Sequence, residues 1–294
     1  MFSWQQSAPI ICSAPMHGIT NSAQRQIFKK FGADVVFSEM VSSMGIKYEN
    51  KKTEHKTNFL PSEKPIIVQI FGSTVSETIN AARYAANIGA DAIDFNCGCP
   101  ARNMIASGNG GQLLLEPEKL IDILYRIKQA VKIPVSLKTR IGYDEILPPA
   151  YYQNIVEQSG IDCLIIHGRT VKQQYRGLAD WNHIKKIASG IRIPVIGSGD
   201  IVNPTIALDR IANYTPHGIM IGRGALGNPW IFKFTKSFLQ NQTQQPTDII
   251  FSKIIKTVLL HTRLQIKEFQ SSPYYTTKFN SQQIPCFSFL KLST

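Results

Sequence analysis

Short apolar runs alternate with segments of helical composition along most of this 294-residue chain. Eight such runs occur, and several begin at a proline, which suits the first residue of a strand. The runs are Pro9–Met16, Val35–Met40, Pro65–Phe71, Ala92–Cys97, Pro134–Lys138, Cys163–His167, Pro194–Ser198 and Gly218–Ile221. A strand that alternates with a helix eight times is the signature of a parallel (β/α)8, or TIM, barrel. We therefore predict an α/β fold of this class.

The segments between the runs carry apolar residues at helical spacing. Helices are predicted at Asn21–Phe31, Ser76–Ile88, Glu118–Val131, Ala150–Gln158, Asn182–Ala188 and Thr205–Ile211. Gly32, Gly89, Gly160 and Gly190 follow four of them, at the position where glycine commonly ends a helix. The stretch Lys47–Phe59 is polar and lacks a period, so we expect it to be irregular.

Composition limits the class of protein. A hydrophobic content of 43% supports a large core, no apolar run is long enough to predict a membrane span, and the N-terminus does not resemble a signal peptide. The five cysteines are an odd number without framework spacing, which favours a reducing cytoplasm over secretion. Cys97 and Cys99 form a C-x-C motif without a second ligand pair, so no metal site is expected.

The chain carries a net charge of +12, and about half of this excess lies between Trp230 and Thr294. Such a balance is compatible with a nucleic-acid partner and equally with a solvated basic surface. Within this region Thr247–Phe269 reads as a basic amphipathic helix, which is more often packed against its own domain than against a partner. We expect a barrel domain over residues 1–240 and a smaller helical region over residues 241–294.

Reactive and polar residues follow the predicted strands at their C-terminal ends, which converge on one mouth in a barrel. They are His17, Gln69, Asn96, Cys99, Lys138, Arg140, His167, Arg169, Asp200 and Arg223. The segment Asn96–Pro100 is the most informative, because it holds a thiol between a glycine and a proline at a strand end. Most cysteines are buried and only fill the core, but the polar and turn-forming neighbours of Cys99 favour a functional role.

Glycine turns follow the last two strands, at Ser198–Asp200 and Ile221–Gly224. They match the usual phosphate site of barrel enzymes, where backbone N–H groups approach the phosphate closely and Arg223 would add charge. Lys138, across the mouth, could place a cation beside the pyrimidine end of a flavin, and Gln69 could bond the same ring edge. A sugar-phosphate substrate would suit the same turns.

Eight segments of the chain form a pattern: Ala14–Met16, Ser38–Ser43, Val68–Gly72, Asn96–Pro100, Leu137–Gly142, His167–Thr170, Gly177–Trp181 and Met220–Trp230. Together they resemble the tRNA-dihydrouridine synthase family. The resemblance covers residues 8 to 240 in the right order, and the bacterial B-type branch is nearest. It implies an FMN enzyme that reduces the C5–C6 bond of selected uridines in tRNA, with NADPH as reductant.

The resemblance also assigns roles. Cys99 matches the catalytic acid, and a thiol can protonate C5 because it is mostly protonated at neutral pH. The positions expected to contact FMN are Pro15, Met16, His17, Gln69, Lys138, His167, Ser198, Gly199, Asp200, Gly222 and Arg223. Asn96, Arg140 and Arg169 are expected on the substrate side. The target base must leave its stack to reach a flavin, which favours loops over duplex.

The sequence departs from the family pattern in three places. His17 stands where a small residue is usual, and Ser198 replaces an asparagine. The family normally ends in a helical domain with a basic helix that grips tRNA, whereas here the chain runs into an aperiodic tail, so we expect a truncated or frame-disrupted C-terminus. A flavin barrel reductase of a small molecule and a degraded RNA-binding paralogue remain as alternatives. A monomer is expected.

Overall fold

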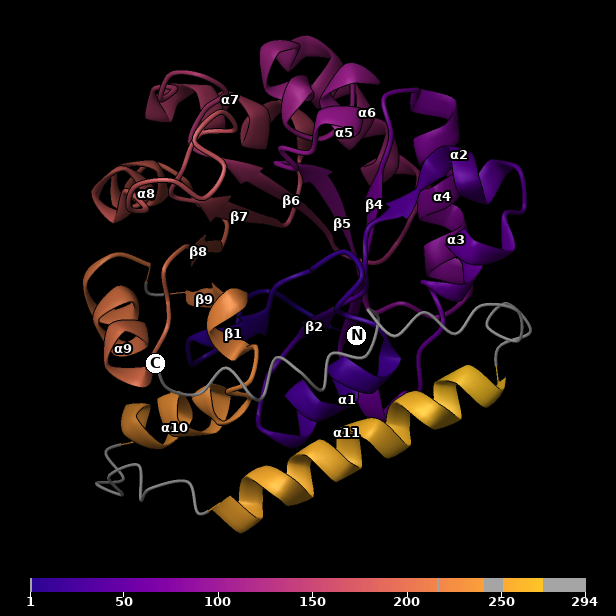
Figure 1. Ribbon diagram of the computed structural model, residues 1–294. Coiled ribbons are helices and arrows are strands. Elements are labelled where there is room, and N and C mark those ends of the chain that lie inside the picture. The colour runs from indigo at the N-terminus through magenta and orange to yellow at the C-terminus, as the bar shows by residue number, and fades with distance from the viewer. Residues whose placement is uncertain (1, 216, 241–250, 272–294) are drawn as a thin grey trace.

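The computed structural model describes residues 2–215, 217–240 and 251–271. Their centre is a sheet of parallel strands in the order β1-β9-β8-β7-β6-β5-β4-β2. Its strands are β1 (Ile10–Ser13), β2 (Val36–Phe37), β4 (Ile66–Phe71), β5 (Ala92–Cys97), β6 (Val135–Arg140), β7 (Cys163–His167), β8 (Val195–Ser198) and β9 (Gly218–Ile221). A parallel bridge between Cys12 and Val35 joins the two ends of this order. The sheet therefore closes into the predicted (β/α)8 barrel (Figure 1).

Helices surround the barrel where the sequence predicted them. They are α1 (Ser22–Lys30), α4 (Val75–Asn87), α6 (Pro117–Ala130), α7 (Pro149–Ser159), α8 (Trp181–Ser189) and α9 (Pro204–Asn213), followed by α10 (Trp230–Leu239). Gly160 ends α7 in the left-handed conformation, at φ 67°. Short elements decorate the connections: α5 (Arg102–Ala106) and the 3-10 turns η1 (Pro61–Glu63), η2 (Gly110–Leu115) and η3 (Arg223–Ala225).

The prediction that Lys47–Phe59 is irregular was wrong. A short strand β3 (Val41–Ser42) pairs with the end of β4 and leads into α2 (Ser43–Lys47) and α3 (Lys51–His55). Asn50 starts α3, because its side-chain oxygen accepts hydrogen bonds from the N–H groups of Lys52 and Thr53 at 3.0 and 3.2 Å. Capping stabilises a short polar helix without any apolar period, so the hydrophobic pattern could not reveal it.

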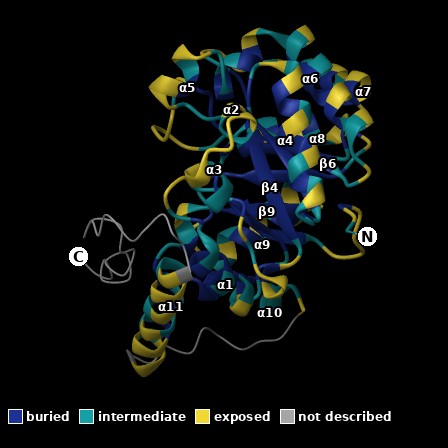
Figure 2. Ribbon diagram, turned by 90° about the vertical axis from the view of Figure 1, so that its right-hand side faces the viewer, coloured by how far each residue is buried: buried dark blue, intermediate teal, exposed yellow. Residues whose placement is uncertain are grey.

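Strand alternation separates two apolar layers. Side chains of one parity pack between the barrel and the helices, and those of the other parity fill the barrel interior. The interior layer includes Cys12, Ile67, Cys163 and Met220, and Trp4 packs with it. Figure 2 shows the strands buried at the centre, with exposed residues mainly on the outer helices and loops. Towards the C-terminal ends of the strands the same interior positions become polar, and this change creates the site.

The predicted C-terminal helix is confirmed over the described residues as α11 (Phe251–Ser271). It lies beside α1 (Figure 1), where the Glu268 carboxylate accepts from the N–H groups of Ser22 and Ala23 at 3.3 and 3.0 Å. A carboxylate at a helix N-terminus satisfies unpaired N–H groups and the helix dipole. The helix thus packs against its own domain, as expected.

The face that α11 buries differs from the one its apolar residues suggest. Thr257, His261 and Gln265 form its buried stripe, whereas Leu259 and Ile266 are about half exposed. Polar contact with α1 therefore contributes to fixing the orientation of α11. The predicted domain boundary at residue 240 borders the segment 241–250, which lies outside the described residues, as does the tail from residue 272.

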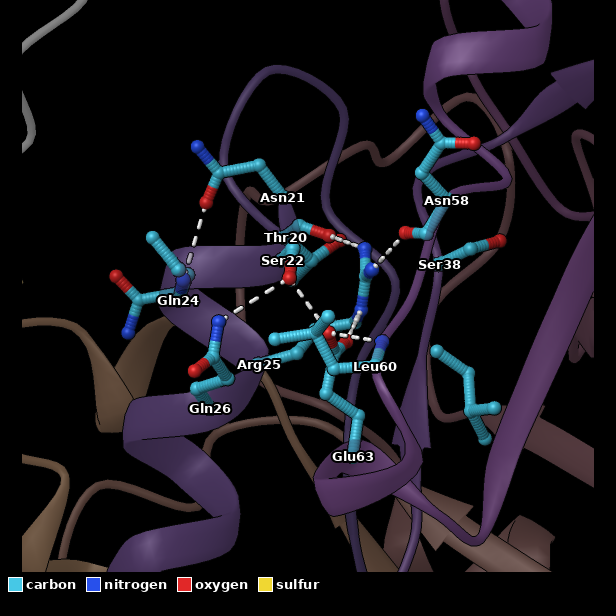
Figure 3. Close-up of polar contacts among 12 residues, drawn as sticks. Thr20, Asn21, Ser22, Gln24, Arg25, Gln26, Ser38, Asn58, Leu60 and Glu63 are labelled. Carbon is cyan, nitrogen blue, oxygen red and sulfur yellow. Dashed lines mark hydrogen bonds and ion pairs between the residues drawn. The ribbon is translucent and has the colours of Figure 1, made fainter. Parts of the chain in front are cut away.

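A buried ion pair anchors the start of α1 (Figure 3). The Arg25 and Glu63 side chains are both buried, and Arg25 Nε donates to Glu63 Oε2 at 2.6 Å. Two further donors of Arg25 bond the carbonyls of Thr20 and Asn58, at 2.7 and 2.6 Å. Because each guanidinium nitrogen donates to an oxygen, the pair ties α1 to η1 without an uncompensated buried charge.

Candidate active site

A cavity of about 790 Å³ opens at the C-terminal ends of the strands. Thirteen of the predicted site residues line it: Pro15, Met16, His17, Asn96, Cys99, Lys138, Arg140, His167, Ser198, Gly199, Asp200, Gly222 and Arg223. The alternation of side chains along the strands explains why many of these residues point into the cavity. Asn96 pairs in register with Lys138, and Arg140 pairs with His167, which pairs with Ser198. Paired residues of neighbouring parallel strands point to the same face, so all five point into the barrel mouth.

Hydrogen bonds to its backbone groups hold the Cys99 loop in place. Asn96 Oδ1 accepts from the N–H groups of Gly98 and Cys99 at 3.2 and 3.1 Å. The Gly98 carbonyl accepts from Arg140 Nε at 2.8 Å, and the Cys99 carbonyl accepts from Gly111 N at 3.1 Å. Cys99 itself is partly exposed at the cavity. The loop therefore presents a thiol on a braced backbone.

Cys97 lies in a different environment. It is fully buried in the layer between the barrel and the helices, on the strand face opposite to Asn96. Burial raises the pKa of its thiol to about 12, so it stays protonated and unreactive at neutral pH. The two cysteines of the C-x-C motif thus have separate surroundings, as the alternation along β5 requires.

Two predicted residues do not line the cavity. Gln69 is fully buried beneath it, where Nε2 donates to Asp94 at 2.6 Å and Oε1 accepts from Asn96 at 3.0 Å. Arg169 is also buried and lies behind Asp200, to which it donates at 2.7 and 2.8 Å. Contact of either residue with a ligand stays a prediction, and both support residues that do reach the cavity.

Lys138 is half-buried in the cavity wall. Burial lowers the pKa of its ammonium to about 8, and the nearby Asp94 carboxyl opposes this shift. Among the residues that the structure describes, no side chain forms a hydrogen bond or ion pair with it. A cation without a fixed partner at a cavity wall is available to a ligand.

Arg140 and His167 line the cavity beside Lys138. Arg140 Nη1 donates to the carbonyls of Thr170 and Gln174 at 2.9 and 2.7 Å, so most of its guanidinium braces the loop after β7. Burial, followed by the charges of Arg140 and Lys138, holds the pKa of His167 well below its ordinary value. His167 is therefore neutral near pH 7, and one ring nitrogen carries a proton while the other can accept one.

The first glycine turn approaches its neighbours closely. Gly199 has φ 129°, and a Cβ there would lie 2.5 Å from Ala179 Cβ and 3.1 Å from the His167 ring. The Asp200 carboxylate accepts from Ala179 N at 2.8 Å, and hydrogen bonds and charge from Arg169 outweigh burial to lower its pKa. Only glycine fits this turn without strain.

Arg223 lines a more open part of the cavity near Asp200, and its side chain is 56% exposed. Its guanidinium lies 3.6 Å from the Asp200 carboxylate and 4.4 Å from the Tyr175 ring centroid. Next to it, a Cβ on Gly224 would meet the Ile201 carbonyl oxygen at 2.1 Å. The second glycine turn therefore also depends on close backbone approach.

His17 lies at the rim, where its side chain is 63% exposed. Its Nδ1 is 3.2 Å from Lys56 Nζ and 3.5 Å from the Glu39 carboxylate. Burial and the Lys56 charge lower the pKa of His17, so it is mostly neutral at pH 7. This residue, which departs from the family pattern, points toward α3 and not only toward the cavity.

Three residues of the site were not predicted from the sequence. Tyr175 lines the cavity between two arginines, Met40 accepts from Asn96 Nδ2 at 3.2 Å, and Asp94 lies in the polar layer beneath. Asp94 was visible as a carboxylate that interrupts an apolar strand. No periodic signal marks Tyr175, because it comes from an irregular loop.

Among the described residues, no group of three or more His, Cys, Asp or Glu side chains is arranged to hold a metal ion. None of the described helices has the length and apolar character that crossing a membrane would need.

Solved structures of similar fold include a histamine dehydrogenase from Rhizobium sp. 4-9, with a TM-score of 0.59 and 12% identity over 86% of this chain and 48% of that one. A mandelate oxidase has a TM-score of 0.53 and 14% identity over 82% of this chain and 73% of that one. At these identities the likeness concerns the fold, and it agrees with the barrel described above.

Sequence relatives are more specific. A probable tRNA-dihydrouridine synthase of Rickettsia bellii (strain RML369-C) is 35% identical over 246 residues, which cover 83% of this chain and 76% of that protein. The tRNA-dihydrouridine synthase B of Xanthomonas axonopodis pv. citri (strain 306) is 36% identical over 233 residues, 79% of this chain and 70% of that protein. The family model described as dihydrouridine synthase (Dus) matches residues 12–285. The chain therefore belongs to the dihydrouridine synthase family, and the predicted resemblance, B-type branch included, is confirmed.

Proposed function

We propose that this protein reduces the C5–C6 double bond of selected uridines in tRNA, with FMN as its cofactor and NADPH as its reductant. One observation carries the proposal: the Cys99 thiol, the Lys138 ammonium and both glycine turns line a single cavity at the barrel mouth. The names of the matched relatives support tRNA as the substrate.

The residues of the cavity suit the two ends of FMN. On one side, Gly199, Gly222 and Arg223 combine close backbone approach with an exposed guanidinium, which fits a phosphate. On the other side, Lys138 offers a cation that no described side chain pairs, which fits the electron-rich pyrimidine end of a flavin. The other proposed FMN contacts are Pro15, Met16, His17, Gln69, His167, Ser198 and Asp200.

The proposed chemistry divides a hydride and a proton between two faces of the uracil ring. Bound FMN, after reduction by NADPH, would supply the hydride to C6. As negative charge develops toward C5 and the C4 carbonyl, the Cys99 thiol donates its proton to C5, and the C5–C6 double bond becomes single. The resulting thiolate regains a proton from solvent, to which Cys99 is partly exposed. Asn96 contributes by holding the Cys99 backbone.

RNA suits this mouth because Arg140, which is not among the proposed FMN contacts, adds positive charge to the cavity lining. A base must leave its stack to enter a cavity of this kind, so an unpaired loop uridine is the expected target. Substrate contacts are proposed for Asn96 and Arg140, with Arg169 acting from behind Asp200. We further propose that residues 241–294 take part in RNA binding and that the protein acts as a cytoplasmic monomer.

The test compares two cysteine variants with the wild type. Cys99→Ala should still bind FMN and oxidise NADPH but should form dihydrouridine at less than about 1% of the wild-type rate, the order of a lost general acid. Cys97→Ala is the matched control, because Cys97 is buried away from the cavity, and it should retain activity. Mass spectrometry of nucleosides from unmodified tRNA measures the product. Full dihydrouridine formation by Cys99→Ala would remove Cys99 from the proposed role.

A salt titration distinguishes tRNA from a small-molecule substrate. Binding through several phosphates weakens steeply with ionic strength, because condensed counterions are released, whereas binding of a neutral pyrimidine does not. We expect tRNA affinity to fall at least tenfold between 50 and 200 mM salt, about the change that a few phosphate contacts produce. Salt-independent activity on a free pyrimidine, without activity on tRNA, would favour the small-molecule alternative.

A further inference from the structure

A chain of buried hydrogen bonds starts beneath the cavity at Asp94. This side chain points into the barrel from β5 and is fully buried. Its Oδ1 accepts from Ser136 Oγ at 2.7 Å, and its Oδ2 accepts from Gln69 Nε2 at 2.6 Å. The register explains the contacts, because Asp94 is paired with Gln69 on one side and with Ser136 on the other. Asp94 does not line the cavity.

The chain continues upward to the Cys99 loop. Gln69 Oε1 accepts from Asn96 Nδ2 at 3.0 Å, and Asn96 Oδ1 accepts from Gly98 N and Cys99 N. Each amide has a donor end and an acceptor end, so the orientation of one amide dictates the next. The Asp94 oxygen at the start accepts from Gln69, and the N–H groups of Gly98 and Cys99 at the other end can only donate, so both ends favour the same direction of the chain.

We propose that Asp94 is a positioning residue for Cys99: through the amides of Gln69 and Asn96 it holds the Gly98–Cys99 backbone, and therefore the thiol, at the cavity. The inference rests on the proposed role of Cys99 as proton donor and adds how that donor is held. Asp94 itself touches no substrate or cofactor in this scheme.

The contribution of the Asp94 carboxyl group can be judged from what its removal would leave unbonded. With leucine at position 94, Gln69 Nε2 loses its buried acceptor, which is costly enough to favour a flipped amide. A flipped Gln69 presents its NH2 to the Asn96 NH2, and a flipped Asn96 would then present donors to the N–H groups of Gly98 and Cys99. Every alternative leaves an unmade buried hydrogen bond, so the loop loosens.

Asparagine at position 94 separates hydrogen bonding from charge. Its carbonyl can accept from Gln69 while its NH2 donates to Ser136 Oγ. Ser136 can then donate to the Ile93 carbonyl, which already lies 3.4 Å away. Asp94→Asn therefore keeps the direction of the chain, and Asp94→Leu does not.

The chain also tolerates either protonation state of the acid. Burial raises the pKa of Asp94 to about 7, so the charged and neutral forms are both populated near neutral pH. The neutral acid can carry its proton on Oδ1 and donate it to Ser136, which leaves Oδ2 free to accept from Gln69.

Hydrogen exchange of the Gly98 and Cys99 amides tests the proposal directly, because both N–H groups are the end of the chain. We expect both amides to exchange about tenfold faster in Asp94→Leu and in Gln69→Leu, the order expected for one lost hydrogen bond, and near the wild-type rate in Asp94→Asn. The double variant should be no faster than either leucine variant alone. Asp122→Leu and Asp122→Asn, the same two chemical changes on the surface of α6, are the matched controls.

A second readout separates positioning from general damage to the fold. Asp94→Leu should slow dihydrouridine formation at least tenfold in a single turnover while NADPH oxidation by the flavoprotein continues, and Asp94→Asn should restore most of that loss. Unchanged amide exchange in folded Asp94→Leu would overturn the proposal. If that variant did not fold, unchanged exchange in Gln69→Leu would overturn it equally.

The exchange experiment needs neither FMN nor tRNA. Its failure therefore refutes the positioning role alone, whereas failure of the proposed function shows as full activity in Cys99→Ala.

Discussion

Asp94 makes stability depend on pH in a way that its conversion to asparagine should abolish. Its pKa rises from about 3.8 to about 7 because the barrel interior disfavours the charged form, although Gln69 and Ser136 bond to it. The folded state thus holds this proton more tightly than the unfolded state does. Stability from this group is fully present below about pH 4 and is lost as the pH rises to about 7.

The magnitude follows from the size of the shift. A change of about three pKa units corresponds to roughly 4 kcal/mol between the two extremes, of which roughly 2–3 kcal/mol falls between pH 5 and pH 7.5. Asp94→Asn cannot ionise and lacks this contribution. The unfolding free energy of Asp94→Asn minus that of the wild type should therefore rise by roughly 2–3 kcal/mol from pH 5 to pH 7.5.

Urea unfolding of both proteins at pH 5, 6, 7 and 7.5 measures the difference. Subtracting the two curves cancels the shared groups that do not interact with Asp94. Lys138 does interact with it, and the range ends below the region where this ammonium, whose pKa is about 8, mainly titrates. Asp122→Asn on the surface is the control and should track the wild type. Parallel pH profiles for Asp94→Asn and the wild type would show that Asp94 is not a costly buried charge, and the reasoning would fail.

Three further predictions concern other parts of the molecule. Arg25→Met leaves Glu63 buried without its partner, so thermal and urea unfolding should show a loss of about 3–5 kcal/mol, and a loss below 1 kcal/mol would contradict the buried-pair account. Gly199→Ala forces a Cβ to within 2.5 Å of Ala179 in a positive-φ turn; FMN fluorescence titration should show affinity lowered at least tenfold, and unchanged affinity would remove this turn from the cofactor site. Glu268→Gln weakens the cap on α1, so the free energy of unfolding should fall by about 0.5–1 kcal/mol. An unchanged free energy of unfolding would contradict a stabilising contact between α11 and α1.

Much of the site could be predicted because it depends on strand alternation. Once Asn96, Lys138 and His167 are placed on neighbouring strands at interior positions, their convergence follows from the register of a parallel barrel. The glycine turns were equally visible, since positive φ and close backbone approach require glycine.

The rest depends on contacts that no local pattern encodes. Gln69 and Arg169 donate to Asp94 and Asp200, and these tertiary hydrogen bonds could not be read from the sequence, whereas contact of either residue with a ligand stays a prediction. Tyr175 enters the site from an irregular loop, and α3 forms through a cap within a polar segment. In each case a specific polar partner, and not hydrophobic periodicity, decides the position.

The most direct test of the account is dihydrouridine formation by the purified protein, incubated with FMN, NADPH and tRNA that lacks the modification. Mass spectrometry should detect dihydrouridine at defined loop positions, dependent on both FMN and NADPH. Tightly bound FMN and steady NADPH oxidation without any dihydrouridine in tRNA would contradict the claim that this cavity reduces tRNA uridines.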